Sequence, residues 1–522
     1  MFESPHTPVE IPETSVFDLL FADLSDEDRG RTALVDGASG AATSYGELAD
    51  RSLALAGALA ARGLGPGDVV ALHSPNVPAF AIVFHGILRS GATATTVNAM
   101  MNATEIGKQL ADSKASMLFT VSPLAPQAIE AAAANGIPAE RIVVLDGLEG
   151  YASLTDLLRE GHAAPEITID AATHVAVMPY SSGTTGNPKG VMLSHRNLVA
   201  NVVQCIRLID VRADDRVIAV LPFFHIYGMT VLLNIALHQR AALVTMPRFD
   251  LTEFLRIIQD ERITFAFIAP PIAVALAKHP LVDEYDHSAL HTIMSGAAPL
   301  DEALGRAVEA RLGVEMLQGY GMSELSPVSH VIPRGSAAPL SSSGQTIPNM
   351  QSRIVDIETG DDIPLPAEGV SERGELWVRG PNVMLGYLNN DAATAETIDA
   401  DGFLHTGDIA VVDAAGNVSI VDRLKELIKY KGYQVAPAEL EALLLTSPEV
   451  ADAAVIGVPD DAAGEIPKAF VVRTGDDVTE ESVMAFVAER VSLYKRVRAV
   501  AFVDAIPKSA AGKILRKDLR GA

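Results

Sequence analysis

The segment from Ser181 to Gly190 is rich in the residue types that contact phosphate groups. It reads SSGTTGNPKG, follows an apolar stretch typical of a strand (174–180), and precedes a helix that opens near Ser194. Glycines allow close backbone approach, hydroxyl and backbone N–H groups donate hydrogen bonds to phosphate oxygens, and Lys189 adds a positive charge. The spacing is not that of a Walker A loop, because Pro188 and not glycine precedes the lysine. Taken alone, the segment fits either a phosphate-binding loop or an ordinary flexible turn.

Seven further segments carry chemistry-bearing residues in one order along the chain. They are LPFFHIYG (221–228), SGAAPL (295–300), QGYGMSELSP (318–327), GELWVRGPNVMLGY (374–387), DGFLHTGD (401–408), DRLKELIKYKGYQVAPAELE (422–441) and PKSAAGKILRKDLR (507–520). With the 181–190 loop, these segments resemble the acyl-adenylate-forming superfamily of acyl-CoA synthetases, peptide-synthetase adenylation domains and beetle luciferases. The resemblance covers most of the chain, and residues 425–441 are most similar to 4-coumarate–CoA ligases and related bacterial aryl- and acyl-CoA ligases.

The resemblance implies an enzyme that uses ATP to convert a carboxylic acid to its adenylate and then transfers the acyl group to coenzyme A. In the first step a carboxylate attacks the α-phosphorus of ATP and expels pyrophosphate, so two anions must meet. Catalysis of such a step rests on positioning and on cationic stabilisation. The family pattern implies that Lys513 bridges the carboxylate and the α-phosphate, and that Glu324 holds Mg²⁺, a hard cation suited to carboxylate and phosphate oxygens.

The resemblance also implies how ATP is bound. The 181–190 loop would hold the β- and γ-phosphates, Tyr320 would lie against the adenine, and Asp408 and Arg423 would reach the ribose. Ser323 stands where close relatives usually carry threonine, and it keeps the hydroxyl donor for the α-phosphate. Taken singly, Asp408 also fits an ordinary aspartate in a turn. The expected ATP-binding residues are Ser181, Ser182, Gly183, Thr184, Thr185, Gly186, Lys189, Gln318, Gly319, Tyr320, Ser323, Asp408 and Arg423.

The pocket for the acid is expected to be apolar. The resemblance implies that it is lined by Tyr227, Gly296, Ala297, Gly321, Pro327 and Val328. These residues are small, apolar or aromatic, which favours a hydrophobic acid of the aryl, fatty or polycyclic kind. Amino-acid-activating relatives carry an aspartate for the substrate ammonium near LPFFHIYG, whereas no carboxylate occurs from Leu221 to Gln239 here. An amino-acid substrate is therefore disfavoured.

The second half-reaction needs the thiol of coenzyme A to reach the acyl carbonyl after pyrophosphate leaves. The resemblance implies that a small domain rotates about a hinge and presents a different face to the site. His225 matches a residue that commonly gates the thiol route, although it also fits a hydrogen-bonded core histidine. The expected coenzyme A contacts are Arg248, Lys431 and Gly432, and the expected residues of the hinge and of domain closure are Lys425, Lys429 and Gln434.

Other functions share part of this pattern. An acyl-AMP ligase that loads a carrier protein instead of coenzyme A is the nearest alternative. A luciferase-like oxygenase shares the motifs but needs a special luciferin. A non-catalytic nucleotide-binding regulator is disfavoured, because Lys513, Glu324 and the 181–190 loop are all present.

The arrangement of strand-like and helix-like segments predicts how these residues are positioned. Apolar runs at 69–74, 115–122, 141–146, 174–180, 216–222, 241–247 and 264–270 alternate with helical patterns, which is typical of parallel sheets covered by helices. From about residue 350, shorter strands between Gly and Asp turns indicate a β-rich subdomain. The expected fold is α/β. A large N-terminal domain (1–424) contains the parallel-rich sheets, their covering helices and the β-rich subdomain, and a small, mobile α+β C-terminal domain (425–522) follows.

Composition narrows the partners and the compartment. The 522 residues carry a formal net charge of −26 and a sequence pI near 4.8, which argues against broad binding to nucleic acid or anionic membranes. The single cysteine, Cys205, excludes a disulfide framework and fits a reducing cytoplasm. Residues 217–239 lack Asp, Glu, Lys and Arg, but Pro222 and a strand-like start favour a buried strand, loop and helix over a membrane span. The N-terminus does not have the pattern of a signal peptide, and a homodimer is left open.

Overall fold

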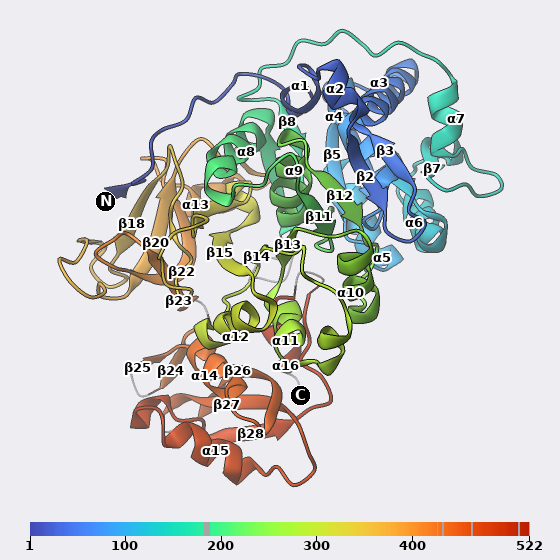
Figure 1. The fold of residues 1–522 in the computed structure, drawn as a ribbon. Coiled ribbons are helices and arrows are strands. Elements are labelled where there is room, and N and C mark those ends of the chain that lie inside the picture. The colour runs from blue at the N-terminus through green and yellow to red at the C-terminus, as the bar shows by residue number, and fades with distance from the viewer. Residues whose placement is uncertain (182–187, 425, 431–432, 461–462, 510–511, 521–522) are drawn as a thin grey trace.

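The fold is described from a computed structural model of the chain (Figure 1). The description covers residues 1–522 with the exception of 182–187, 425, 431–432, 461–462, 510–511 and 521–522. Within these limits the strands form four sheets, three in a large amino-terminal part and one in a smaller carboxyl-terminal part, here called the small domain. In Figure 1 the small domain, in orange and red, lies below α11 and α12.

The largest sheet has a parallel centre and antiparallel edges. In spatial order it runs β17-β16-β15-β14-β13-β11-β12-β2-β3. Its strands are β2 (Thr32–Asp36), β3 (Ala42–Ser44), β11 (Arg216–Ala219), β12 (Ala242–Thr245), β13 (Phe265–Ile268), β14 (Thr292–Ser295), β15 (Glu315–Gly321), β16 (Val328–Val331) and β17 (Gln345–Thr346). Strands β2, β12, β11, β13, β14 and β15 pair in parallel, and buried apolar residues fill most of them, as expected for strands covered on both faces.

A second mixed sheet carries the strands that flank the 181–190 segment. Its order is β21-β10-β8-β5-β4-β6-β7, with β9 paired to β10. The strands are β4 (Val69–His73), β5 (Thr93–Val97), β6 (Met117–Thr120), β7 (Ile142–Val144), β8 (Val175–Val177), β9 (Tyr180–Ser181), β10 (Lys189–Ser194) and β21 (Gly386–Tyr387). The apolar runs predicted as strands therefore fall in the two parallel-rich sheets.

Two further sheets are largely antiparallel. The third sheet contains β1 (Phe2–Glu3), β18 (Gln351–Val355), β19 (Asp362–Ile363), β20 (Gly374–Arg379), β22 (Leu404–Val412) and β23 (Val418–Arg423), which form the expected β-rich region. The sheet of the small domain contains β24 (Ile428–Tyr430), β25 (Tyr433–Val435), β26 (Val450–Asp460), β27 (Gly464–Arg473) and β28 (Ala499–Phe502). This domain has its own apolar core, built on Ile428, Leu440, Leu444, Val455 and Val471 among others.

Helices cover the sheets, and several begin at sequence signals for a helix start. They are α1 (Val16–Phe21), α2 (Asp26–Gly30), α3 (Tyr45–Ala61), α4 (Pro78–Ser90), α5 (Ala103–Ser113), α6 (Ala125–Ala134), α7 (Leu154–Arg159), α8 (His195–Ile209), α9 (Ile235–His238), α10 (Leu251–Asp260), α11 (Pro270–Lys278), α12 (Glu302–Leu312), α13 (Asp391–Thr397), α14 (Pro437–Leu445), α15 (Glu480–Ala488) and α16 (Arg516–Leu519). Ser44, Asn102 and Ser194 form capping boxes at the starts of α3, α5 and α8.

The uncharged stretch 217–239 is divided among several elements. It contains most of β11, a loop, a buried π-helix (Tyr227–Asn234) and the short α9. This agrees with the interpretation as a buried strand, loop and helix. Across the residues that the structure describes, every helix falls short of the length and apolar character needed to cross a membrane.

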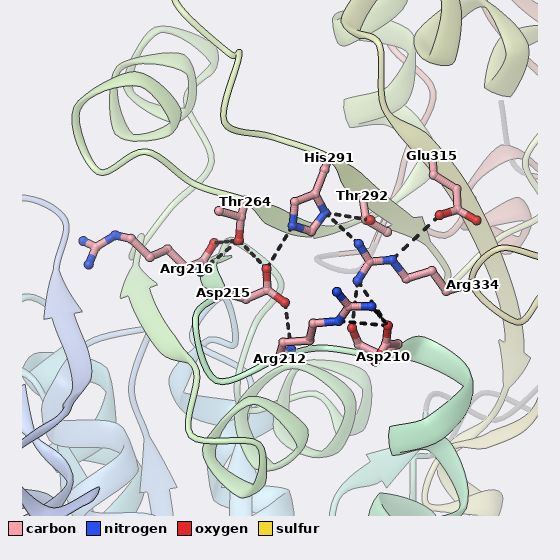
Figure 2. Close-up of polar contacts among 9 residues, drawn as sticks. All are labelled: Asp210, Arg212, Asp215, Arg216, Thr264, His291, Thr292, Glu315 and Arg334. Carbon is pink, nitrogen blue, oxygen red and sulfur yellow. Dashed lines mark hydrogen bonds and ion pairs between the residues drawn. The ribbon is translucent and has the colours of Figure 1, made fainter. Parts of the chain in front are cut away.

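A polar network ties together the amino ends of the parallel strands in the largest sheet (Figure 2). Asp215, which is 4 % exposed and precedes β11, accepts hydrogen bonds from the backbone N–H of Arg212 at 2.7 Å and from Thr264 Oγ1 at 2.6 Å. His291 Nε2 lies 3.0 Å from the same carboxylate, and Arg334 Nη2 lies 3.2 Å from His291 Nδ1. Because a guanidinium can only donate, Arg334 is the donor to His291 Nδ1, and His291 Nε2 is the donor to Asp215.

We expect Asp215→Ala to lower the free energy of unfolding by about 2–4 kcal/mol, because it leaves three buried or half-buried donors without their acceptor. Asp214→Ala removes the neighbouring exposed carboxylate and is the matched control, with an expected change of about 0.5 kcal/mol or less. Urea unfolding followed by circular dichroism compares the two variants. Equal midpoints would contradict a stabilising role for this network.

Candidate functional site

The base of the 181–190 loop is a short antiparallel hairpin. Ser181 in β9 pairs with Lys189 in β10, and Tyr180 pairs with Gly190. The hydroxyl of Tyr180 donates to Asp112 Oδ2 of α5 at 2.7 Å, and this contact fixes the base of the hairpin to a neighbouring helix. Among the expected phosphate contacts, Ser182, Gly183, Thr184, Thr185 and Gly186 lie outside the described residues.

Lys189 and Glu324 meet at one tyrosine. The ammonium nitrogen of Lys189 lies 4.5 Å from the ring centroid of Tyr387, a cation–π geometry. The hydroxyl of Tyr387 donates to Glu324 Oε1 at 2.9 Å, and Glu324 is only 5 % exposed. Burial and the nearby Glu324 carboxylate raise the pKa of Tyr387, so the phenol keeps its proton for this hydrogen bond. Tyr387 ends the 374–387 motif but is not among the residues expected at the site.

Asp408 is the centre of a second group. Its Oδ2 accepts a 2.5 Å hydrogen bond from the hydroxyl of Tyr320, and its Oδ1 lies 3.5 Å from Arg423 Nε. Asp408 and Arg423 face one another in the register of β22 and β23, whereas Tyr320 comes from β15 of the largest sheet. Burial raises the pKa of Asp408, and the positive charge of Arg423 opposes that rise. The structure thus brings together the residues expected at adenine and ribose.

Lys513 reaches this group from the small domain. Burial and the adjacent charge of Arg423 lower the pKa of Lys513 to about 8, while the charge of Asp408 favours its protonated form. The same ammonium charge, after the larger effect of burial, helps to lower the pKa of His225 to about 4. A β-carbon built on Gly512 would lie 3.3 Å from Ala269 Cβ, so Gly512 packs against the N-terminus of α11. The structure therefore brings Lys513, Asp408, Arg423 and His225 into one neighbourhood.

Gln318, Gly319 and Ser323 support or border this group. The side chain of Gln318 accepts from the backbone N–H of Leu300 at 3.0 Å and donates to the carbonyl of Leu300 at 3.1 Å. It therefore braces the segment 295–300. A β-carbon on Gly319 would lie 3.2 Å from the carbonyl oxygen of His330 and 2.8 Å from the flexible end of Met294, so the backbone here is closely packed. Ser323 begins the short 3₁₀ helix that carries Glu324.

Of the residues expected to line the acid pocket, Gly296, Ala297 and Gly321 lie at the carboxyl ends of β14 and β15. Pro327 immediately precedes β16, Val328 begins it, and Tyr227 begins the π-helix. A β-carbon on Gly296 would lie 2.7 Å from Tyr227 Cε1, so the tyrosine ring lies directly on this glycine. Ala297, next in sequence, has a φ of 70°. Gly321 pairs with Val328, and a β-carbon there would lie 2.2 Å from the carbonyl oxygen of Pro327. These contacts leave no room for a side chain at Gly296 or Gly321, and they bring the six residues into two adjoining groups.

The residues expected to serve coenzyme A and domain closure are only partly described. Arg248 is exposed beyond the end of β12, and Lys429 is exposed in β24 of the small domain. Neither takes part in the contacts given above. Gln434 lies in β25, whereas Lys425, Lys431 and Gly432 fall outside the described residues.

Comparison with known proteins identifies the family. The model for AMP-binding enzymes matches residues 21–388, and the model for the C-terminal domain of AMP-binding enzymes matches residues 439–513. The chain belongs to the AMP-binding enzyme family. Its expected membership of the acyl-adenylate-forming superfamily is thereby confirmed.

Relatives of this AMP-binding enzyme match all or nearly all of its length. It is 42 % identical to 4-coumarate–CoA ligase 5 of Oryza sativa subsp. japonica over 100 % of this chain and 97 % of that protein. It is also 42 % identical to 4-coumarate–CoA ligase 2 of Petroselinum crispum, over 94 % of this chain and 91 % of that protein.

Solved structures share the fold. The ATP-bound crystal structure of MatB from Rhodopseudomonas palustris matches with a TM-score of 0.87 and 31 % identity, covering 97 % of this chain and 98 % of that chain. The anthranilate CoA ligase AuaEII in complex with anthranoyl-AMP matches with a TM-score of 0.89 and 26 % identity, covering 98 % of each chain. The expected fold class, a large α/β domain followed by a small α+β domain, is confirmed.

The closeness of Lys513 to Asp408 can be tested by titration. At pH 8 about half of Lys513 carries a free amine, since its pKa is about 8. We expect Asp408→Asn to lower this pKa further, because it removes a negative charge that favours the ammonium form. The pKa of Lys513 is measured by trace labelling with an amine-reactive reagent across a pH series. Mass spectrometry then quantifies the label on the peptide that contains Lys513. Asp413→Asn, in the turn between β22 and β23, is the control, and an identical shift in both variants would contradict the geometry.

Proposed function

We propose that this AMP-binding enzyme is an ATP-dependent acyl-CoA ligase. It adenylates a hydrophobic carboxylic acid, with aryl acids as the first class to test, and transfers the acyl group to coenzyme A with release of AMP and pyrophosphate. The observation that carries the proposal is the contact group of Tyr320, Asp408 and Arg423, whose charges act on the pKa of Lys513 from the end of the chain. The full-length similarity to 4-coumarate–CoA ligases supports the choice of acid and acceptor.

In the adenylation step the chain supplies cations and position. Lys513 lies where its ammonium group can neutralise the acid carboxylate and the α-phosphate as they approach, and Lys189 stands at the base of the phosphate loop. Asp408 accepts hydrogen bonds from ribose hydroxyls, and Arg423 contributes from the facing strand. Tyr320, held by its bond to Asp408, lies against the adenine. The oxygen of the acid attacks phosphorus, the bond to pyrophosphate breaks, and no proton transfer is required.

Glu324 fits the part of a magnesium ligand. It is buried, one of its oxygens accepts from the hydroxyl of Tyr387, and the positive charge of Lys189 lies over the ring of the same tyrosine. Within the described residues no group of three or more His, Cys, Asp or Glu side chains is placed to hold a metal ion. One carboxylate together with nucleotide phosphate oxygens is the usual arrangement for Mg²⁺, which when bound neutralises phosphate charge.

The acid lies between the two groups at Gly296 and Gly321. The ring of Tyr227 forms one wall, supported by an edge-to-face contact with Phe267 at 6.4 Å between ring centroids. Glycine at both positions lets the Tyr227 ring and the 327–328 backbone pack closely, and these form the apolar walls against which the acid would lie. The six proposed lining residues, Tyr227, Gly296, Ala297, Gly321, Pro327 and Val328, contain no charge to pair with a substrate ammonium.

Thioester formation follows in a second orientation of the small domain, which we place at residues 425–522 against a large domain of 1–424. The sulfur of coenzyme A attacks the acyl carbonyl carbon, AMP leaves, and the thiol proton is lost to solvent. Because the pKa of His225 is lowered to about 4, it is neutral at neutral pH and can gate the thiol route without repelling Lys513. Arg248, Lys431 and Gly432 contact coenzyme A, and Lys425, Lys429 and Gln434 serve the hinge and domain closure. Such an enzyme suits the cytoplasm and can act as a monomer or homodimer.

The function is tested by incubating the enzyme with ATP, Mg²⁺, coenzyme A and a panel of aryl, fatty and polycyclic acids. We expect pyrophosphate release and an acyl-CoA product by mass spectrometry. Lys513→Ala should slow adenylate formation by about 100-fold or more, because it removes a cation from the developing charge, and should retain thioester formation from supplied acyl-AMP. Adenylate without thioester would favour the carrier-protein ligase, and unchanged adenylation in Lys513→Ala would refute the role of this lysine.

Tyr387→Phe tests the placement of Glu324. The change removes the hydroxyl that orients the carboxylate, so we expect the apparent affinity for Mg²⁺ in the presence of ATP to fall about tenfold, as when a residue behind a metal ligand is lost. The apparent affinity for Mg²⁺ is measured by calorimetric titration of MgATP and by the Mg²⁺ dependence of pyrophosphate release. Tyr285→Phe, a partly buried tyrosine after α11, is the control, and equal affinities in the two variants would count against Glu324 as the ligand.

A further inference from the structure

Helix α14 is the first helix of the small domain, and its N-terminus has no capping side chain from its own N-cap residue. Its N-cap residue is Ala436, and the N-cap position makes no side-chain cap bond. The backbone N–H of Ala438 in the first turn donates instead to Asp422 Oδ2 at 3.0 Å. Asp422 lies in β23 of the large domain. The helix is therefore capped from the other side of the domain junction.

The burial of Asp422 shows that this cap is a built contact. The residue is 5 % exposed, and its Oδ1 accepts the backbone N–H of Arg423 at 2.6 Å. Burial raises the pKa of Asp422 to about 7, while the two backbone donors and the charge of Arg516 favour the ionised form. A buried carboxylate is costly unless donors surround it, and one of its donors belongs to α14. If the helix separates from β23, the Asp422 carboxylate loses its hydrogen bond from the backbone N–H of Ala438.

A second contact joins the same turn of α14 to the large domain. Glu439 Oε2 lies 3.7 Å from Arg373 Nη2, and Arg373 immediately precedes β20. The other oxygen, Glu439 Oε1, accepts from Lys495 Nζ within the small domain at 2.5 Å. We name the two contacts Asp422–Ala438 and Arg373–Glu439 the α14 clamp.

The α14 clamp is coupled to Lys513 through one arginine. Arg516, three residues after Lys513, forms an ion pair with Glu441 of α14 at 2.7 Å and another with Glu426. Its Nε also donates to the carbonyl of Val455 at 3.3 Å. These contacts fix the Lys513 segment to α14, so an orientation imposed on the helix is imposed on Lys513 as well.

We propose that Asp422 and Arg373 are positioning residues, which hold the first turn of α14 so that Lys513 stays beside Asp408 during adenylation. This inference rests on the proposed function, because it assigns the α14 clamp to one of two half-reactions. Both residues precede the proposed hinge at Lys425, whereas α14 follows it. Rotation about that hinge breaks both contacts, so the clamp favours the first half-reaction and opposes entry into the second.

The two half-reactions are measured separately to test this. Single-turnover pyrophosphate release with ATP and acid reports adenylation, and synthetic acyl-AMP with coenzyme A reports thioester formation. We expect adenylation to fall about twofold to fivefold in Arg373→Ala, as for loss of an exposed ion pair, and about threefold to thirtyfold in Asp422→Ala, as for loss of a helix cap. Thioester formation from supplied acyl-AMP should be unchanged or faster in both variants.

Conservative and matched variants separate this role from a loss of stability. Arg373→Lys keeps the cation and should return adenylation to near the wild-type rate. Arg51→Ala is the matched control, since Arg51 also pairs with a glutamate, Glu47, at 3.4 Å and is 43 % exposed against 46 % for Arg373. It should alter neither half-reaction. If Asp422→Ala fails to fold, Asp422→Asn keeps the shape of the side chain without its charge and should still slow adenylation selectively.

The proposed role of the α14 clamp is refuted if the variants lose equal activity in both half-reactions. It is also refuted if both Arg373→Ala and Asp422→Asn keep wild-type rates. A wild-type enzyme that forms neither adenylate nor thioester from any acid overturns the proposed function, and this inference with it. An active wild type with unaffected clamp variants overturns the inference alone. The two failures are therefore distinguishable in one set of assays.

Discussion

The placing of two cations beside one buried carboxylate is the constraint on which the site depends. Burial, and after it the nearby positive charge of Arg423, lower the pKa of Lys513 to about 8, while Arg423 itself pairs with Asp408. An arrangement of this kind is unfavourable in the free protein and becomes favourable when an anion enters. In the proposed function, the carboxylate and the triphosphate supply the negative charge that stabilises these two cations.

Holding these charges in place requires elements from distant parts of the chain. Tyr320 comes from the largest sheet, Asp408 and Arg423 come from the antiparallel hairpin β22–β23, and Lys513 comes from the small domain. The hairpin is the central element, because the same strand that presents Arg423 also presents Asp422 to α14. Neighbouring side chains on β23 therefore contact the Asp408 group and helix α14. This links the charges around Asp408 to the orientation of the small domain.

Much of this arrangement follows from local sequence patterns. The parallel strands are short apolar runs, and the starts of α3, α5 and α8 carry their own capping residues, so their positions could be predicted. The motif residues were predicted through a resemblance, and the structure brings Tyr320, Asp408, Arg423 and Lys513 together. The domain boundary and the role of each site residue stay predictions.

Other contacts could not be read from sequence because their partners lie far apart. Tyr387 bonds to Glu324 across 63 positions, and Tyr180 bonds to Asp112 across 68. Gln318, expected to contact ATP, has its side-chain amide bonded to the backbone of Leu300. The cap of α14 is the clearest case, since Ala436 gives no local signal and its substitute, Asp422, is distinguished only by its place at the end of β23.

In the largest sheet, the stabilising polar network lies at the amino ends of the strands, and the candidate site lies at their carboxyl ends. Asp215, Thr264 and His291 precede β11, β13 and β14, and they bond to one another at the amino edge (Figure 2). At the opposite edge, Gly296 and Ala297 follow the end of β14, and Tyr320 and Gly321 form the end of β15. Ligands of α/β proteins bind at the carboxyl edge, where loops can vary without disturbing strand pairing. A satisfied polar network at the amino edge fixes the strand register, which leaves the carboxyl edge free to hold strained turns and closely placed charges.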